Sequence, residues 1–255
     1  MNNIFENKLN ILKEFMEICN ENSLWYSLDS NTLLALVNNL SYWDQIDHYD
    51  VMMTFDSYEK LRNLFPNKVI DSVKHSDYLS LQNKFVFDVS KIYEECPFVN
   101  INLVIPTTTK RVKKYLKYKN RIKAFVNHFS TMNLTNISKI KSKIRTAKFL
   151  KPVVKGINYK DIYNILYDEE NEGFLVTSPL INKKSLKKWI TNISYKLINI
   201  EKNDLKFKAI YEYDYYLKSH YGRNWSKIEE IEIDYLHKNV IDIDKYETII
   251  DENNI

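Results

Sequence analysis

YSLDSNTLLALVNNLSYWDQIDHYDVMMTF, residues 26–55, holds an aliphatic run between two short runs that are rich in aromatic and apolar side chains. The first run, which begins at residue 24, and the last run, residues 48–55, predict β-strands, and residues 31–39 predict a short helix. A helix that joins two strands of a small sheet is typical of mixed α/β and α+β domains. This stretch sets the fold class, and its second strand begins with the polar letters DHYD.

The cluster from Asp47 to Asp50 crowds carboxylates at the start of a strand. Carboxylates this close repel each other unless a cation lies between them. Residues i and i+2 of a strand share a face, so His48 and Asp50 point the same way, whereas Asp47 points the opposite way once the strand has begun. The residues alone fit a metal site, a degraded metal site or an ordinary polar turn.

The pattern outside this stretch completes an α+β (mixed α/β) fold, a small mixed sheet flanked by helices. Apolar periodicity, alternation and end signals predict these further elements: a helix at 4–19, a helix at 56–65 capped by Asp56 or Ser57, two strands within 78–92, a strand at 98–106, a basic helix at about 109–127, helices at 161–170 and 184–194, a strand or extended segment at 173–180, a strand at 204–210, and a helix at 213–222 with Gly222 as its C-cap. We expect a core at 1–127 with a mainly helical region at 128–255 packed on it, and an acidic tail after about residue 229.

Composition excludes several classes of protein. With 255 residues the chain is long enough for a sizeable core, and its 3 glycines nearly exclude a glycine-rich phosphate loop. Its 2 cysteines form no CxxC pair, which excludes a zinc ribbon and suggests buried thiols in a reducing compartment. The sequence lacks a run of about 18 apolar residues and begins with mixed charges, so we expect a cytoplasmic protein.

The charge is distributed unevenly along the chain. Residues 96–160 contain 16 Lys and Arg and no acidic residue, whereas the remaining residues carry 21 basic and 33 acidic side chains. A segment this basic favours an anionic partner: a nucleotide, an acidic lipid surface or nucleic acid. The alternative is a solvated basic helix face followed by a linker.

The stretch from Tyr26 to Leu61 resembles, without a gap, the LicD family of phosphotransferases, which includes the fukutin-related proteins. The matching residues are Leu28, Thr32, Leu33, Leu34, Val37, Asp47, Asp50, Val51, Met53, Tyr58, Glu59 and Lys60. The segments SKIYEE, around Lys91, and VNINLVIP are similar to the family's next two motifs, and Tyr213, Asp214, Leu217, Tyr221 and Gly222 match its closing pattern. The resemblance covers about residues 4–105 and 203–226, and it implies a nucleotidyltransferase-like fold.

The resemblance also implies the roles of the site residues. Asp50, Asp47 and Asn102 fall on or beside the catalytic carboxylate positions, and Asp50, His48 and Asp47 are the implied metal ligands, for Mg²⁺ or Mn²⁺. Ser30, Asn31, Thr32 and Lys91 are the implied phosphate-binding residues. The departures are substantial: Ser30-Asn31 replaces Gly-Gly, His48 replaces the first aspartate of the D-x-D pair, and Asn102 replaces the third carboxylate. The site therefore carries two fewer formal negative charges than the family pattern.

Three functions follow as expectations. The first is a LicD-like transferase that moves phosphocholine, or a related phospho-substituent, from a CDP-linked donor to a cell-surface glycan or glycolipid precursor, with a peripheral contact to an anionic membrane. The second is a catalytically degenerate relative that binds a nucleotide or acts as a scaffold. The third, a nucleic-acid-directed protein, ranks last, because the basic segment has few interleaved aromatic residues.

Overall fold

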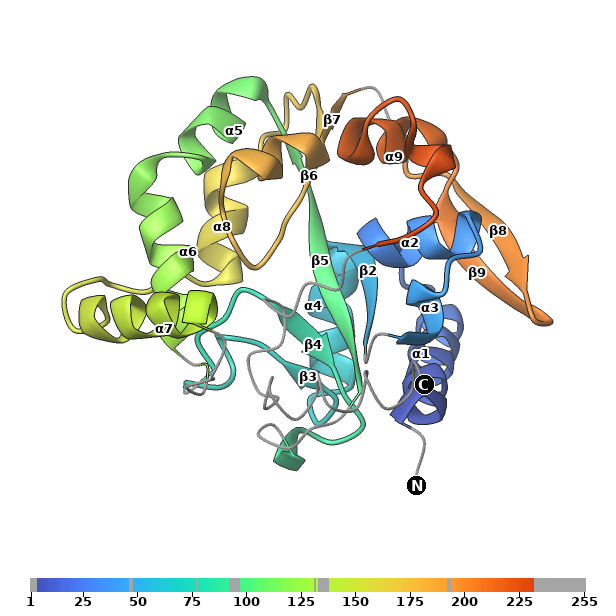
Figure 1. Ribbon diagram of the computed structural model, residues 1–255, viewed down its shortest axis with the longest axis horizontal. Coiled ribbons are helices and arrows are strands. Elements are labelled where there is room, and N and C mark those ends of the chain that lie inside the picture. Colours follow the sequence, from blue (N-terminus) through green and yellow to red (C-terminus); the bar gives the residue numbers. More distant parts are fainter. Residues whose placement is uncertain are drawn as a thin grey trace.

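The computed structural model describes residues 4–45, 48–76, 78–91, 97–130, 132, 138–191 and 194–231. The chain forms an α+β fold in which helices surround a mixed sheet (Figure 1). Its helices and strands, in chain order, are α1 (Ile4–Glu21), β1 (Tyr26–Leu28), α2 (Ser30–Val37), α3 (Tyr42–Gln45), β2 (His48–Thr54), α4 (Phe55–Leu64), β3 (Val69–Ile70), β4 (Asn83–Phe85), η1 (Val89–Lys91), β5 (Phe98–Thr107), α5 (Thr109–Tyr115), α6 (Tyr118–Ser130), α7 (Ser138–Leu150), α8 (Tyr159–Leu166), β6 (Gly173–Val176), η2 (Lys183–Lys188), β7 (Trp189–Thr191), β8 (Leu197–Lys202), β9 (Leu205–Ile210), α9 (Tyr213–Tyr221) and η3 (Trp225–Lys227).

Strand β5 is the centre of the main sheet. It pairs with β2 in parallel along one side, and along its other side it pairs with β4 and then with β6, both antiparallel. Strand β1 extends the sheet beyond β2, β3 extends it beyond β4, and β7 extends it beyond β6. The long β5 ribbon runs through the middle of the molecule in Figure 1.

The two faces of the sheet differ in polarity because side chains alternate along each strand. Val51 and Met53 of β2 are fully buried on the face where α1 and α4 pack. On that face the ring of Phe15 makes edge contacts with Tyr26 of β1 and Phe85 of β4. The opposite face carries the polar side chains of β2 and β5, so the alternation seen in the sequence separates a dry core from a candidate site.

The C-terminal part of the chain completes this sheet. Strands β6 and β7 extend the sheet built by the N-terminal residues, so the sheet crosses the boundary predicted at residue 127. The β8–β9 hairpin packs beside β1, where Ser27 Oγ accepts a hydrogen bond of 3.0 Å from the N–H of Ile210. Most of the predicted acidic tail lies outside the described residues, which end at Ile231.

Local hydrogen bonds explain where the predicted elements differ from the observed ones. The basic helix is two helices, α5 and α6, because the side-chain amide of Asn120 donates to the carbonyls of Lys114 and Tyr115 and thereby ends α5. Two strands were predicted within 78–92, and the described residues 78–91 form one, β4, since Ser80 and Gln82 make turn-like bonds with their neighbours instead. Where a helix was predicted at 184–194, the described residues up to Thr191 form the short η2 followed by β7, and residues 192–193 lie outside the described residues.

The ends of α4 and α9 show one wrong prediction and one confirmed one. The N-cap of α4 is Thr54, whose hydroxyl accepts a 3.3 Å bond from the N–H of Ser57, rather than Asp56 or Ser57. Gly222 caps the C-terminus of α9 as predicted, with a φ of 95° that favours glycine. Among the residues that the structure describes, no helix is long and apolar enough to span a bilayer.

Candidate functional site

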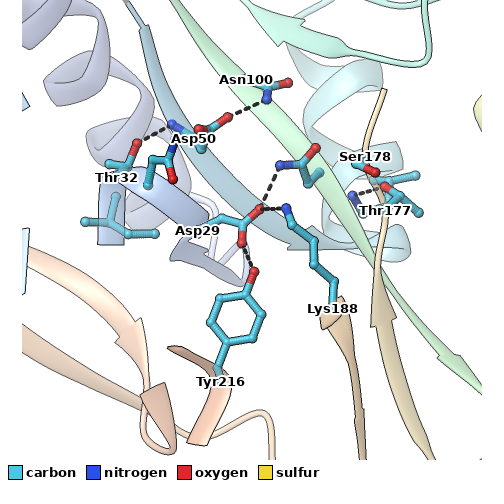
Figure 2. Close-up of polar contacts among 12 residues, drawn as sticks. Asp29, Thr32, Asp50, Asn100, Thr177, Ser178, Lys188 and Tyr216 are labelled. Atoms are coloured by element: carbon cyan, nitrogen blue, oxygen red, sulfur yellow. Dashed lines mark hydrogen bonds and ion pairs between the residues drawn. The ribbon is translucent and has the colours of Figure 1, made fainter. Parts of the chain in front are cut away.

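The candidate site lies on the polar face of the sheet, where the start of α2 meets β2 and β5. The parallel register places Asp50 of β2 directly opposite Asn100 of β5, and Met52 opposite Asn102. The N–H of Asp29, just after β1, donates 3.0 Å to the carbonyl of Asp50. The strands β1, β2 and β5 therefore bring two aspartates and two asparagines from three places in the sequence onto one face. Figure 2 shows Asp29, Asp50 and Asn100 of this group.

Asp50 is held by its neighbours on both sides. Its backbone N–H donates 2.8 Å to Oγ1 of Thr32 in α2, and its Oδ1 accepts a 2.5 Å bond from the side-chain amide of Asn100. Nε2 of His48 lies 4.0 Å from the same carboxylate oxygen. The imidazole of His48 is buried and stacks on the ring of Phe98, with centroids 4.8 Å apart. Asp50 is buried but, at 8% exposed, less completely so than Asp29.

Asp29 forms the most buried part of the site. Its carboxylate is fully buried and has three partners from distant elements. Oδ2 accepts 2.7 Å from the amide of Asn102 and 3.1 Å from Nζ of Lys188, and Oδ1 accepts a hydrogen bond from the hydroxyl of Tyr216. Figure 2 shows Lys188 and Tyr216 converging on Asp29 from two other parts of the chain.

These contacts keep Asp29 ionised. Burial by itself raises the pKa of Asp29, but the Lys188 ammonium and the hydrogen bonds from Tyr216, Lys188 and Asn102 outweigh it, so its pKa lies below the ordinary value. Burial and the adjacent Asp29 charge raise the pKa of Tyr216 well above its usual value. At neutral pH the group is thus a carboxylate paired with an ammonium, with a neutral phenol as donor.

Helix α9 covers the site with a second layer of aromatic side chains. The hydroxyl of Tyr221 donates 2.5 Å to Oδ1 of Asn31, whose amide in turn donates 3.3 Å to the hydroxyl of Tyr42. The ring of His220 stacks on Tyr216 with an interplanar angle of 2° and meets Tyr221 edge-on. Burial, followed by the nearby Lys188 charge, lowers the pKa of His220 to about 3, so this imidazole is neutral at pH 7.

The structure brings most of the expected site residues together. Six of the predicted site residues have described side chains that lie at the site: Ser30, Asn31, Thr32, His48, Asp50 and Asn102. Thr32 supports the backbone of Asp50, and Asn102 uses its amide as a donor to Asp29. Asp47 lies outside the described residues, and of Lys91 only the backbone, at the end of η1, is described.

The possible metal ligands among the described residues of this site do not fit Mg²⁺. Such a site needs several oxygen ligands that carry negative charge. Asp29 is already neutralised by Lys188, and Asp50 is left with an imidazole and an amide beside it. No group of three His, Cys, Asp or Glu side chains able to hold a metal ion occurs within the described part of the chain.

Sequence reasoning missed four residues of this arrangement: Asp29, Asn100, Lys188 and Tyr216. Asp29 had a detectable signal, because it is an acidic residue placed directly between a predicted strand and a predicted helix. Asn100 lies two residues before Asn102 on the same strand and therefore shares its face. The sequence contains no comparable signal for Lys188 and Tyr216, which reach the site only through tertiary folding.

Comparison of the chain with protein-family models, with curated proteins and with solved structures finds no match. Its function is therefore inferred from the sequence and from the geometry of this site.

Proposed function

We propose that this chain is a LicD-like protein with a degenerate catalytic site, which binds the phosphate-bearing part of a nucleotide without a metal ion. The observation that carries the proposal is the neutralisation of Asp29 by Lys188, Asn102 and Tyr216. A carboxylate paired in this way neither attracts a divalent cation strongly nor repels a phosphate. The remaining carboxylate, Asp50, has an amide and an imidazole as its nearest polar groups.

The start of α2 supplies the phosphate-binding groups. Asp29 occupies the N-cap position of α2 but makes no side-chain capping bond, because its carboxylate points to Lys188 and Tyr216. The first N–H groups of a helix lack acceptors within the helix, and the positive end of the helix dipole favours an anion there. Ser30 takes a φ of 47°, a left-handed conformation that a glycine in the family pattern would adopt easily.

A second candidate is the metal-dependent transferase expected from the resemblance, acting from a cytoplasmic location. Asp50 favours it, because its side chain has the His48 imidazole beside it and is 11% exposed, and histidine accepts Mn²⁺ better than Mg²⁺. In that reaction a sugar hydroxyl would attack the phosphorus that carries choline in a CDP-linked donor, and CMP would leave. Asp47 would have to supply a further carboxylate.

A thermal-shift titration separates the two candidates. The protein is titrated with CTP and with CDP-choline, each with and without Mg²⁺ or Mn²⁺, because a ligand that binds the folded state raises its melting temperature. The proposal predicts a rise without metal that Asp50→Asn leaves intact. A rise that needs metal and is lost in Asp50→Asn would favour the transferase, and no rise under any condition would refute both.

A matched pair of variants locates the bound phosphate. Asn31→Asp keeps the acceptor for Tyr221 and adds one negative charge at the start of α2, so it should weaken nucleotide binding by about tenfold or more. Asn39→Asp makes the same change at the opposite end of α2 and keeps the 2.6 Å contact with Lys202. It should leave binding unchanged. Equal effects of the two variants would place the nucleotide elsewhere.

A further inference from the structure

The C-terminal end of α7 and the turn that follows it each present one large apolar side chain to solvent. Phe149 is 82% exposed and Val153 is 80% exposed. Scattered exposed apolar residues are ordinary, but these two lie four positions apart in the sequence KFLKPVVKG, residues 148–156, and form a local apolar tip where α7 ends.

This exposure is a consequence of how α7 packs. Its inner face, formed by Ile140, Ile144 and Ala147, is buried against Phe129 of α6 and against Met132 in a small cluster separate from the main core. Phe149 lies on the other side of the helix. Hydrogen bonds to the carbonyls of Ala147 and Leu150 then hold the turn, so its apolar tip is fixed outward rather than folded back onto the helix.

The surroundings of this tip are basic. Arg145, Lys148, Lys151 and Lys155 are all exposed, and they form no ion pair with any residue that the structure describes. The chain has no acidic residue from 96 to 160, so no nearby sequence neighbour offsets these charges. In Figure 1, α7 lies at one end of the long axis of the molecule, with the β8–β9 hairpin at the other end.

We propose that the surface formed by residues 145–155 docks on an anionic lipid bilayer. Phe149 and Val153 would enter the boundary between headgroups and acyl chains, while Arg145, Lys148, Lys151 and Lys155 would contact the anionic headgroups. A membrane fits this surface better than nucleic acid, because an exposed valine at the tip gains nothing from stacking on bases. The proposal is independent of the nucleotide site on the polar face of the sheet.

Vesicle co-sedimentation of the full chain tests this proposal. The protein should bind vesicles of phosphatidylcholine mixed with phosphatidylserine, bind vesicles of phosphatidylcholine alone much more weakly, and dissociate as salt is raised. Phe149→Ser combined with Val153→Ser should lower the partition coefficient by about tenfold or more. Lys148→Glu combined with Lys151→Glu should lower it by a similar factor of about ten.

Two matched controls separate the surface from general effects. Leu64→Ser with Val73→Ser removes two other exposed apolar side chains, and Lys206→Glu with Lys218→Glu makes the same change in net charge elsewhere. Both pairs should bind vesicles like the wild type.

In the variant Phe149→Trp, vesicles should shift the tryptophan emission to shorter wavelength.

Three results would overturn the proposal: no binding to the anionic vesicles, undiminished binding by the Phe149→Ser, Val153→Ser variant, or tighter binding to a short RNA duplex than to the vesicles. Every substituted side chain of the surface is exposed, so the variants should keep the wild-type melting temperature. The melting temperature is measured first, and it ensures that a loss of binding reports on the surface rather than on unfolding.

Discussion

The ammonium group of Lys188 lies 3.1 Å from Oδ2 of Asp29, although the two residues are 159 positions apart in the chain. Asp29 stands between β1 and α2, and Lys188 ends the short helix η2 that leads into β7. Both side chains are buried, so each ion depends on the other for its charge balance. This pair links the residue after β1 to the residue before β7 across the polar face of the sheet.

Replacing Lys188 by methionine should destabilise the protein by about 3–5 kcal/mol. The substitution leaves Asp29 buried without its cation, and breaking a buried pair costs more than the pair itself contributes. The free energy of unfolding from urea titration measures the loss. Lys187→Met, at an exposed neighbouring lysine, should change it by no more than about 0.5 kcal/mol. If the double variant Asp29→Asn, Lys188→Met is no more stable than Lys188→Met alone, the uncompensated charge is not the cause.

Replacing Thr32 by valine should destabilise the protein by about 1–3 kcal/mol. Valine has the same shape as threonine but cannot accept the hydrogen bond from the backbone N–H of Asp50, which then stays buried and unpaired. Thr32→Ser keeps the hydroxyl and should cost less than Thr32→Val. Equal losses in the two variants, again measured by urea unfolding, would mean that packing rather than the hydrogen bond is responsible.

Stability should fall in acid in a way that depends on His220. Its pKa is about 3 in the folded protein and 6.5 as the ordinary value, so between these values the unfolded chain binds a proton that the folded chain does not. The free energy of unfolding should therefore rise with pH in this window, by up to about 1.4 kcal/mol per pH unit, and become level above it. His220→Gln should have a flatter profile, and identical slopes for the two proteins would contradict the assignment.

Replacing Gly173 by alanine should destabilise the protein by about 2 kcal/mol or more. A Cβ atom at this position would overlap the carbonyl oxygen of Ile190 and lie 2.7 Å from Cα of Thr191, so backbone would have to move. Because β7 follows Lys188 directly, the shift should also weaken the Asp29 contact. Gly156→Ala is the control, since there the Cβ would meet the side chain of Asn127 rather than backbone, with the nearest atom, its oxygen, at 3.2 Å. Thermal unfolding of the two variants makes the comparison.

The sequence predicted the elements whose pattern is local. The expected strand, helix, strand and helix are present between Tyr26 and Leu64 as β1, α2, β2 and α4, because alternation and helical periodicity are strong there. The short helix α3, between α2 and β2, was not predicted. The wrong predictions lie where the hydrogen bonds of a single side chain set the start or the end of a helix. Asn120 splits one basic helix into two, and Thr54 takes the capping role expected of its neighbours. Such bonds depend on side-chain position, which periodicity does not report.

The candidate site was predictable only in part. The start of α2 and the strand β2 were found because both lie in one continuous stretch, and the parallel pairing with β5 brought Asn102 to them. Lys188 and Tyr216 come from elements whose place beside the sheet is set by long-range packing, and this packing changes the expected meaning of the site. The site was expected to attract a metal cation, but the ammonium group of Lys188 already neutralises the carboxylate of Asp29.

The position of β5 has a consequence for any attempt to express the N-terminal part of the chain alone. Residues 104–107 of this strand pair with β6, which comes from the C-terminal part. A fragment ending near residue 127 would expose that length of strand as an open edge, with unpaired N–H and carbonyl groups next to fully buried apolar side chains. Such a fragment should self-associate through this edge, and supplying residues 159–231 as a separate chain should suppress the aggregation.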